Sequence, residues 1–449
     1  MAVTRNRMAL ASTTFFQQFF KTEAAGGVLL LASAGAALAA ANSPWAEAYH
    51  RLWATTVTLG AAGHDLSLTV HQWINDGLMA VFFLLVGLEV KRETLAGELS
   101  SPRQAALPIT AAVGGMVVPM IVSLLASGGG VAQRGWAVAM ATDIAFALGA
   151  LALVAPRAPA GLKIFLAALA IVDDIGAVLV IAFFYTAQIA WPALAMAGLC
   201  ATLLVVFNRL RVRALTPYLL TGVALWFYVH ESGVHATIAG VVLAMAIPIQ
   251  TRINAAEYSA HARELLDAFD QTETGDLLVL KSRGQQEAIF AIGRANLHVL
   301  APLLRLEHAL HGLSAFVVMP LFAFSNAGVT LSGLSVDRVT LAVFLGLALG
   351  KPLGITGAAF AAVRAGLAGL PQGVRWGAMH GCGWLGGIGF TMSLFIATLA
   401  FEGTPLLESA KVGILTASAV AGIVGAVIVR SSLRRETMTV VADRVSSRP

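Results

Sequence analysis

Long apolar stretches recur along almost the whole chain, and many approach the roughly 20 residues that an α-helix needs to span a bilayer. A transmembrane β-barrel would instead show strand-length segments in which apolar and polar residues alternate, and the sequence lacks that pattern. The chain is therefore predicted to be an all-α membrane protein with twelve transmembrane helices. These are expected at residues 20–41, 73–97, 105–126, 136–154, 160–186, 191–207, 215–229, 233–248, 306–328, 339–363, 375–399 and 408–430.

The amino-acid composition agrees with a membrane protein. Charged residues make up 12% of the chain and apolar residues 58%, against about 25% and about 45–50% in soluble proteins. A chain of this composition would not cover its surface with polar groups in water. The first apolar run, residues 26–41, ends in small residues as a signal peptide does, but its polar lead-in is too long for one. We therefore expect the first helix to be retained.

The basic residues are distributed unevenly between the two sides of the predicted bundle. If the N-terminus lies in the cytoplasm, all but five of the 29 lysines and arginines fall in cytoplasmic segments. The exceptions are Arg51, Arg134, Arg338 and Lys411 on the other side, and Lys351 within a helix. This positive-inside pattern predicts an even number of helices with both termini in the cytoplasm. It also explains the net charge of +5 without nucleic acid as a partner.

Two long connections interrupt a single transmembrane domain, which is expected to cover residues 1–435. Residues 42–72 are predicted to face the periplasm and to form a β-hairpin, because two alternating segments flank a longer turn at residues 60–65. Residues 249–305 are polar and of mixed charge, which predicts a cytoplasmic loop with room for an amphipathic helix. Residues 436–449 are expected to form a disordered cytoplasmic tail.

Four charged residues fall inside predicted helices, where a charge costs several kcal/mol and indicates function. They are Asp143, the adjacent Asp173 and Asp174, and Lys351. Neighbouring side chains on a helix point about 100° apart, so both members of the aspartate pair can line one polar cavity. Burial favours the neutral form of a carboxyl group, and a second carboxylate nearby favours it further, so the pair can hold protons near neutral pH.

Carboxylate oxygens also suit a hard cation such as sodium or lithium. A site that binds either protons or a cation, but not both, is what coupled exchange requires. Alternatively, Lys351 could neutralise the pair and merely hold helices together. That alternative is the weaker one, because one lysine cannot balance three buried aspartates.

Glycine is concentrated in the eleventh predicted helix, where five glycines lie between Gly381 and Gly389. The segment contains a formal GxGxxG, but no strand–turn–helix unit surrounds it, so nucleotide binding is not indicated. In a membrane helix such density marks either an interruption or close packing, and we favour the interruption.

At these residues the chain resembles the NhaA-type sodium/proton antiporters of bacterial inner membranes. The matching stretches are Thr142–Ala147, Val172–Gly176, Gly350–Gly354, Gly387–Ser393, Asn75–Glu93, Ser232–Thr237 and Leu306–His311. They occur in order over nearly the whole chain, which makes the resemblance specific. It implies a twelve-helix fold with two inverted three-helix repeats, here helices 3–5 and 10–12, in which helices 4 and 11 are interrupted and cross near the midplane.

The resemblance also implies roles for individual residues. Asp173 and Asp174 would bind sodium or lithium and the protons, and Asp143 with Thr142 would lie at the crossing. Asp143 would offset the positive ends of the half-helices and Lys351 the negative ends. Lys351 would also pair with Asp173 until sodium arrives. The positions tied to a pH response are Glu89, Glu93, His235, Glu307, His308 and His311.

Simpler readings of the pH-response positions stay open. Glu89 and Glu93 could belong to a solvated helix end, and His235 could cap a helix. His308 and His311 are spaced to share a metal, but no third ligand is evident. The connection at residues 249–305 is longer than the usual one before the ninth helix, which leaves the regulation of this chain open.

Antiport of sodium or lithium against protons in the bacterial inner membrane is the predicted function, without catalysis of a reaction and without a cofactor. A homodimer is expected from the resemblance and from the exposed edge of the predicted hairpin. An organic-anion symporter on a similar broken-helix fold is the closest alternative, but adjacent carboxylates would repel an anion. An intramembrane aspartyl protease would place its aspartates on different helices, one of them in a Gly-x-Gly-Asp motif that this chain lacks.

Overall fold

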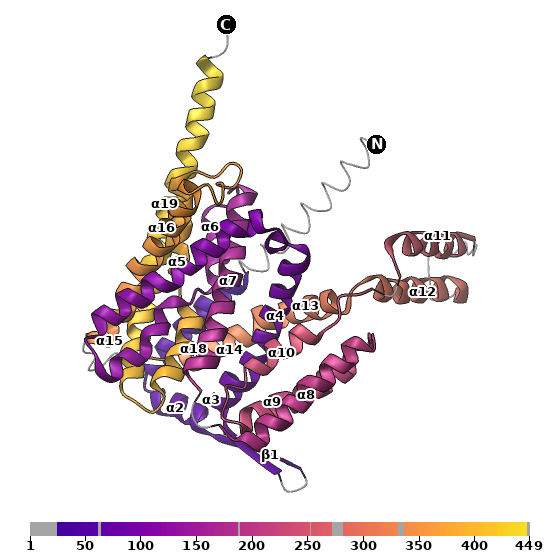
Figure 1. Ribbon diagram of the computed structural model, residues 1–449, viewed down its shortest axis with the longest axis horizontal. Helices are drawn as coiled ribbons and strands as arrows, with labels where there is room; N and C mark the ends of the chain where they lie inside the picture. The colour runs from indigo at the N-terminus through magenta and orange to yellow at the C-terminus, as the bar shows by residue number, and fades with distance from the viewer. Residues whose placement is uncertain are drawn as a thin grey trace.

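The computed structural model describes residues 25–61, 64–186, 189–251, 253–271, 282–330 and 336–446 (Figure 1). Apart from one β-hairpin, the regular elements in this part of the chain are helices, and η marks 3₁₀ or π-helical segments. The helices in chain order are Ala25–Ala41, α2 (Ala46–Ala54), α3 (Val70–Gln72), η1 (Trp73–Leu78), α4 (Met79–Ala96), η2 (Glu98–Ser100), α5 (Pro102–Ser127), η3 (Gly130–Met140), α6 (Ile144–Val154), α7 (Ala160–Phe184), α8 (Trp191–Arg209), α9 (Leu215–Glu231), α10 (Ile238–Ala246), α11 (Ala255–Gln271), α12 (Arg283–Val299), α13 (Pro302–Leu313), η5 (Ser314–Val318), α14 (Met319–Asn326), α15 (Arg338–Leu345), η6 (Gly346–Gly350), α16 (Lys351–Arg364), α17 (Trp376–Leu385), α18 (Phe390–Phe401) and α19 (Leu406–Ser446).

The prediction of an all-helical membrane protein is confirmed. Seven helices in the described part are long and apolar enough to cross a membrane, and ten spans result if each sharply bent pair counts as one. The two expected spans that are not among these ten are α9, with 17 residues, and α10, with 9 residues. α10 begins only at Ile238 and ends two residues before Pro248, and Lys91 Nζ donates to the carbonyl oxygens of Met245 and Ile247 at its C-terminal end, at 2.6 and 2.5 Å.

Two spans are interrupted in mid-course. η3 and α6 meet at an angle of 48° across the extended residues 141–143, and α17 and α18 meet at 43° across residues 386–389. The second break lies in the glycine-rich segment. There a Cβ on Gly387 would come within 2.7 Å of the carbonyl oxygen of Leu347, so only glycine allows this close approach.

The buried apolar residues form two cores. The larger core joins the N-terminal helix, α2, η3, α5 to α7 and α14 to α19. The smaller one joins α8, α9, α10 and α13, and α4 contributes to both. In the larger core α5 packs most extensively against α16. A Cβ on Gly114 of α5 would collide with the carbonyl of Gly354 on α16, and the reverse also holds. Small residues at such a contact let two membrane helices approach closely.

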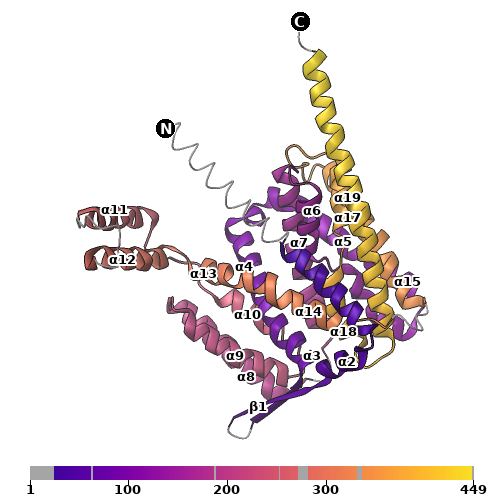
Figure 2. The ribbon, with the colours of Figure 1, turned by 180° about the vertical axis from the view of Figure 1, so that it is seen from behind.

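Residues 42–72 contain a helix and a two-stranded sheet. β1 (Thr56–Ala61) and β2 (His64–Thr69) pair antiparallel, with Thr56 opposite Thr69 and Leu59 opposite Leu66. α2 precedes the strands and lies at 112° to the helix Ala25–Ala41. The hairpin lies at the end of the molecule opposite the C-terminus (Figures 1 and 2).

Two segments outside the candidate spans are also helical. Residues 249–305 contain two helices, α11 and α12, which pack together as a helical hairpin. The last helix, α19, extends beyond its candidate span to Ser446. The sequence has no proline or glycine between Gly425 and Ser446 that would end the helix.

Candidate functional site

α7 carries the adjacent carboxylates near its middle. The helix forms because its 25 residues are almost continuously apolar and contain no proline. Asp173 and Asp174 are nevertheless buried, with 1% and 0% of their surface exposed. Such burial of two neighbouring carboxyl groups requires compensation by a cation, by hydrogen bonds or by protons.

Lys351 supplies part of that compensation to Asp173. It is the first residue of α16, directly after the π-helical segment η6, and its side chain is fully buried. Its Nζ donates to Oδ2 of Asp173 at 2.6 Å, in an ion pair, and also to the carbonyl oxygen of Met140. Met140 is the last residue of η3, so Lys351 places a positive charge at the negative end of that half-helix.

The two interrupted spans contact each other through their breaks. The backbone N–H of Asp143 donates to the carbonyl of Ile388 at 2.7 Å, and Oγ1 of Thr142 donates to the carbonyl of Gly386 at 2.8 Å. A third bond runs from Oγ of Ser393 to the carbonyl of Val138, at 2.7 Å. These bonds use backbone groups that the breaks remove from helical pairing, which is how an irregular segment is tolerated at membrane depth.

Asp143 lies between the starts of two half-helices. It is the N-cap of α6, where its Oδ1 accepts from the backbone N–H of Phe146 at 3.0 Å. Its Oδ2 accepts from the backbone N–H of Thr391 at 3.1 Å and from the Thr391 hydroxyl, near the start of α18. A carboxylate there faces the positive ends of both helix dipoles.

On α7, three buried carboxylate oxygens have no hydrogen-bond partner among the described residues: Oδ1 of Asp173 and both oxygens of Asp174. Buried polar atoms are normally satisfied, so an unsatisfied set calls for a specific explanation. Unpaired carboxylate oxygens can hold a proton or coordinate a hard cation. In the part of the chain that the structure describes, no three His, Cys, Asp or Glu side chains converge on one metal position, so Asp143 does not complete a three-carboxylate site.

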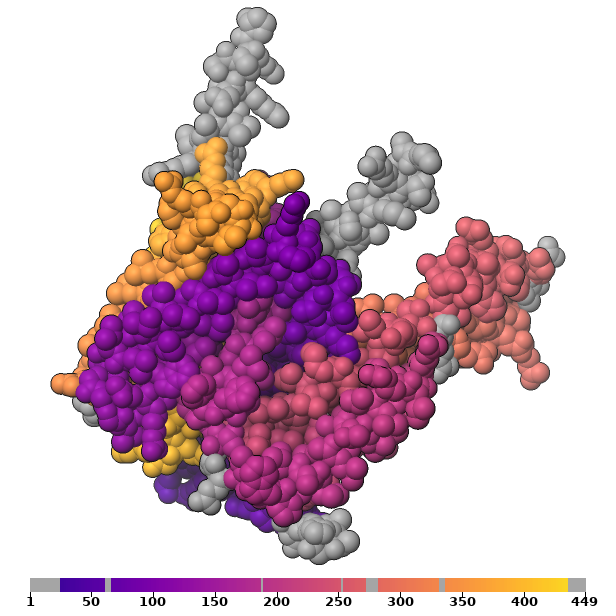
Figure 3. Space-filling view, viewed as in Figure 1, coloured from indigo at the N-terminus to yellow at the C-terminus, as the bar shows by residue number. Residues whose placement is uncertain are grey.

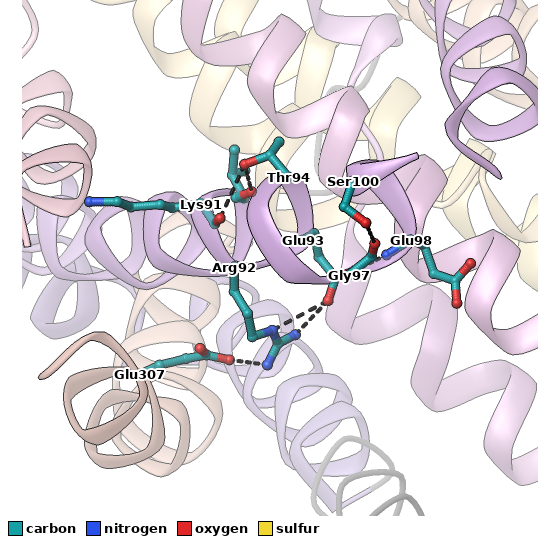
Figure 4. Close-up of polar contacts among 9 residues, drawn as sticks. Lys91, Arg92, Glu93, Thr94, Gly97, Glu98, Ser100 and Glu307 are labelled. Atoms are coloured by element: carbon teal, nitrogen blue, oxygen red, sulfur yellow. Dashed lines mark hydrogen bonds and ion pairs between the residues drawn. The ribbon is translucent and has the colours of Figure 1, made fainter. Parts of the chain in front are cut away.

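Glu93 and Glu307 come together around one arginine at the end of α4. Arg92 forms ion pairs with Glu93, at 3.0 Å, and with Glu307 on α13 (Figure 4). The second carboxyl oxygen of Glu93 accepts from the backbone N–H of Glu98 at 3.0 Å. Glu307 is buried, with 8% of its surface exposed. The ion pair therefore ties α4 to the first turns of α13.

The six positions linked to a pH response do not form one cluster. Glu89 lies one turn before Glu93 on α4, half-buried, and His308 and His311 lie on α13 with Glu307, with His308 exposed. His235 lies elsewhere, in the turn before α10, where its Nε2 is 2.8 Å from the carbonyl oxygen of Tyr185 at the end of α7.

Several residues around the site were not identified from the sequence. Thr391 donates to Asp143, and Arg92 pairs with Glu307, yet each pair is separated by more than 200 residues along the chain. A buried polar network also joins His71, Asn75 and Asn326, with Asn326 Nδ2 donating to Asn75 Oδ1 at 3.0 Å. Polar residues in otherwise apolar segments were the available signal for Thr391 and Asn326.

Comparison with known proteins gives consistent results. A sequence model of the family described as "Na+/H+ antiporter 1" matches residues 17–429. The Na(+)/H(+) antiporter NhaA of Oleidesulfovibrio alaskensis is 51% identical over 402 residues, which is 89% of each chain. That of Rhodospirillum rubrum is 47% identical over 89% of this chain and 92% of its own. The Na(+)/H(+) antiporter NhaA 2 of Helicobacter hepaticus is 42% identical over 95% of this chain and 96% of its own.

Proposed function

Because this multi-pass membrane protein belongs to the Na⁺/H⁺ antiporter 1 family, whose model matches residues 17–429, we propose that it exchanges sodium or lithium for protons at Asp173 and Asp174. The observation that carries the proposal is the set of three buried, unpaired carboxylate oxygens on α7. The names of the NhaA relatives support sodium and protons as the transported ions. A symporter for organic anions fits less well, because unpaired carboxylates would repel the substrate.

Exchange follows from competition for the same oxygens. A proton on Asp174 neutralises the carboxylate and occupies the position where a cation would bind, so the two ligands exclude each other. Sodium is a hard cation that prefers oxygen ligands, and a carboxylate adds negative charge that attracts it. Its arrival would compete with Lys351 for Asp173 and release the ion pair seen at 2.6 Å. The site then faces the opposite side of the membrane with the other ligand bound, sodium in place of protons or the reverse. Because only one of the two can be bound at a time, their movements are coupled.

The crossing residues hold this site in place. Asp143 would offset the positive ends of α6 and α18, Lys351 would offset the negative end of η3, and Thr142 would fasten the two breaks to each other. Half-helix ends inside a membrane are a recurring feature of transporters with inverted repeats, and NhaA is one of these.

The wider architecture follows the same family pattern. We infer twelve transmembrane helices, with α9 and α10 as the seventh and eighth, and inverted repeats formed by helices 3–5 and 10–12. Residues 1–435 would form one transmembrane domain in the bacterial inner membrane. Both termini and residues 249–305 would lie in the cytoplasm, and residues 42–72 in the periplasm, in line with the distribution of basic residues.

The direct test of exchange is proton flux in proteoliposomes that contain the purified protein. Sodium or lithium added outside the vesicles should displace protons from the aspartate pair and drive proton movement across the membrane. Potassium and choline should not have this effect. Absence of a sodium-driven proton signal across a range of pH, in folded protein, would contradict the proposal.

Regulation by pH is proposed to act through Arg92, Glu93 and Glu307, with Glu89, His308 and His311 nearby and His235 acting separately. Carboxyl and imidazole side chains change charge with pH, so these positions can respond to it. The ion pairs join α4 to α13 at one end of the bundle, so a change in charge there alters the packing of two helices.

Replacing Glu307 with glutamine is expected to shift the pH–activity profile toward alkaline pH without lowering maximal exchange. The neutral side chain mimics protonated Glu307, as if the medium were more acidic. Each loss of about 1.4 kcal/mol of interaction with Arg92 corresponds to a shift of about one pH unit. Exchange should be measured across the pH range, with exposed Glu264→Gln on α11 as the matched control. A Glu307→Gln profile that overlays the parent's would rule out this role.

A homodimer is proposed to form through the β1–β2 hairpin. Its strands are paired only with each other in the described structure, and Leu59 is 58% exposed. Unpaired strand edges are templates for pairing with a second copy. Deleting residues 55–70 should give monomers that still exchange sodium for protons. Mass photometry in detergent distinguishes the states, and an unchanged dimer would count against the hairpin as the contact.

A further inference from the structure

The helical hairpin between α10 and α13 takes no part in the proposed exchange site. α11 and α12 pack against each other, and the Tyr258 hydroxyl on α11 donates to Oδ1 of Asn296 on α12 at 2.6 Å. The hairpin stands out from the rest of the molecule beside the start of α13 (Figure 3). The surfaces of this helical hairpin can therefore contact a partner outside the helical bundle.

One face of α12 is apolar although it is exposed. Ala288 and Ala295 are buried, whereas Phe290 is 69% and Leu297 48% exposed. Each helical residue is rotated by about 100°, so Phe290 and Leu297 lie on one line, on the side opposite Ala288 and Ala295. The helix thus buries one side against α11 and presents large apolar side chains on the other.

This apolar face continues toward the membrane-spanning part of the chain. α12 ends at Val299, and the candidate span that contains α13 begins at Pro302. Leu300 and Leu304 extend the exposed apolar surface across the junction, at 45% and 41%. α12 rather than α11 lies on the side of α8 and α9 in both views of the ribbon (Figures 1 and 2). The C-terminal end of α12 therefore lies directly before a candidate membrane span.

The two helices differ in charge. Arg283 and Arg294 are exposed on α12 beside the line of Phe290 and Leu297, and the helix has one acidic residue, Glu287. α11 instead carries four acidic residues against one arginine: Glu257, Glu264, Asp267, Asp270 and Arg263. An anionic surface would thus attract α12 and repel α11. This difference favours the orientation in which the apolar face of α12 is buried in that surface.

We propose that this hairpin docks on the anionic lipid surface of the membrane through α12. Phe290 and Leu297 enter the headgroup region, and Arg283 and Arg294 contact lipid phosphates while their aliphatic stems lie on the apolar face. The docked side is the cytoplasmic one in the orientation proposed above. A lipid surface is the occupant because the apolar face is continuous with a membrane span and is flanked by positive charge.

Depth measurements in proteoliposomes test the docking. Gly293 lies on the same exposed side, and a Cβ there meets nothing within 4 Å, so Gly293→Cys can carry an environment-sensitive fluorophore in a Cys200→Ala/Cys382→Ala background. Asp267→Cys on α11 is the matched control. In phosphatidylcholine vesicles with phosphatidylglycerol, the probe at position 293 should be quenched by brominated lipid and shielded from iodide. The control should show the reverse.

Further variants separate the contributions of charge and apolar contact. Replacing both Arg283 and Arg294 with glutamine should weaken the dependence on phosphatidylglycerol by about fivefold per arginine. Phe290→Asp should remove the lipid quenching at position 293. Equal iodide quenching at positions 293 and 267 would overturn the proposal. A different result would point to a second copy of the chain as the partner and would also overturn the proposal. In that case the probe at position 293 is shielded from iodide but not quenched by brominated lipid, and the shielding is lost when the protein is diluted to one copy per vesicle.

Discussion

Replacing Asp174 with asparagine is expected to reduce sodium-driven proton movement to the background of protein-free vesicles. Neither carboxyl oxygen of Asp174 accepts a hydrogen bond in the described structure, so the substitution removes no donor's partner. The amide is close to a protonated carboxyl group in size and is neutral, as that group is. The variant should therefore insert and fold, yet it can neither release a proton nor supply a negative charge to sodium.

The control for Asp174→Asn is a variant in which an aspartate outside the proposed site is replaced. Asp270→Asn on α11 alters an exposed residue and should exchange ions like the parent. Asp173→Asn should also abolish exchange, but it breaks the contact with Lys351 and is expected to cost stability as well. Near-parental exchange by well-folded Asp174→Asn protein would show that the adjacent carboxylates are not the transport site.

Removing the charge of Lys351 is expected to lower both stability and exchange. Lys351→Ala leaves Asp173 without its cation and the Met140 carbonyl without its donor, in a fully buried environment. Breaking a buried ion pair by removing one partner costs about 3–5 kcal/mol. Thermal unfolding in detergent should show a clear loss relative to the parent, and the exchange rate should fall in the same preparation.

A double variant distinguishes the ion pair from a loss of packing. Lys351→Ala combined with Asp173→Asn removes the uncompensated charge, so the double variant should unfold at a higher temperature than Lys351→Ala alone. If Lys351→Ala melts and transports like the parent, the lysine neither balances the aspartates nor takes part in exchange. A double variant no more stable than the single one would assign the loss to packing.

Much of this fold was predictable because apolar length is a strong signal. Residues 160–186 were expected to form a helix and α7 covers Ala160–Phe184, and the family resemblance is confirmed over residues 17–429. The charges at membrane depth also identified the candidate site, since aspartate and lysine are rare in such segments. Glycine density pointed to the break between α17 and α18.

Features created by contacts between distant segments were not predictable. The break between η3 and α6 was expected only from the family resemblance, because it has no glycine or proline, and its extended residues are held by bonds from Thr142 and Asp143 to the other break. Arg92 was counted only as a basic residue near a helix end, because nothing local indicates its pairing with Glu307.

Competition between sodium and protons is the central claim, and the sodium concentration for half-maximal exchange tests it most directly. That concentration should be measured in proteoliposomes between about pH 8.5 and about pH 6.5, where protons can occupy a buried pair of carboxylates. Protonation removes the sodium ligands, so the required sodium concentration should rise as pH falls. The rise should approach roughly tenfold per pH unit for one competing proton, and more if the pair loses two protons together. A half-maximal sodium concentration that stays flat across this range would contradict the account.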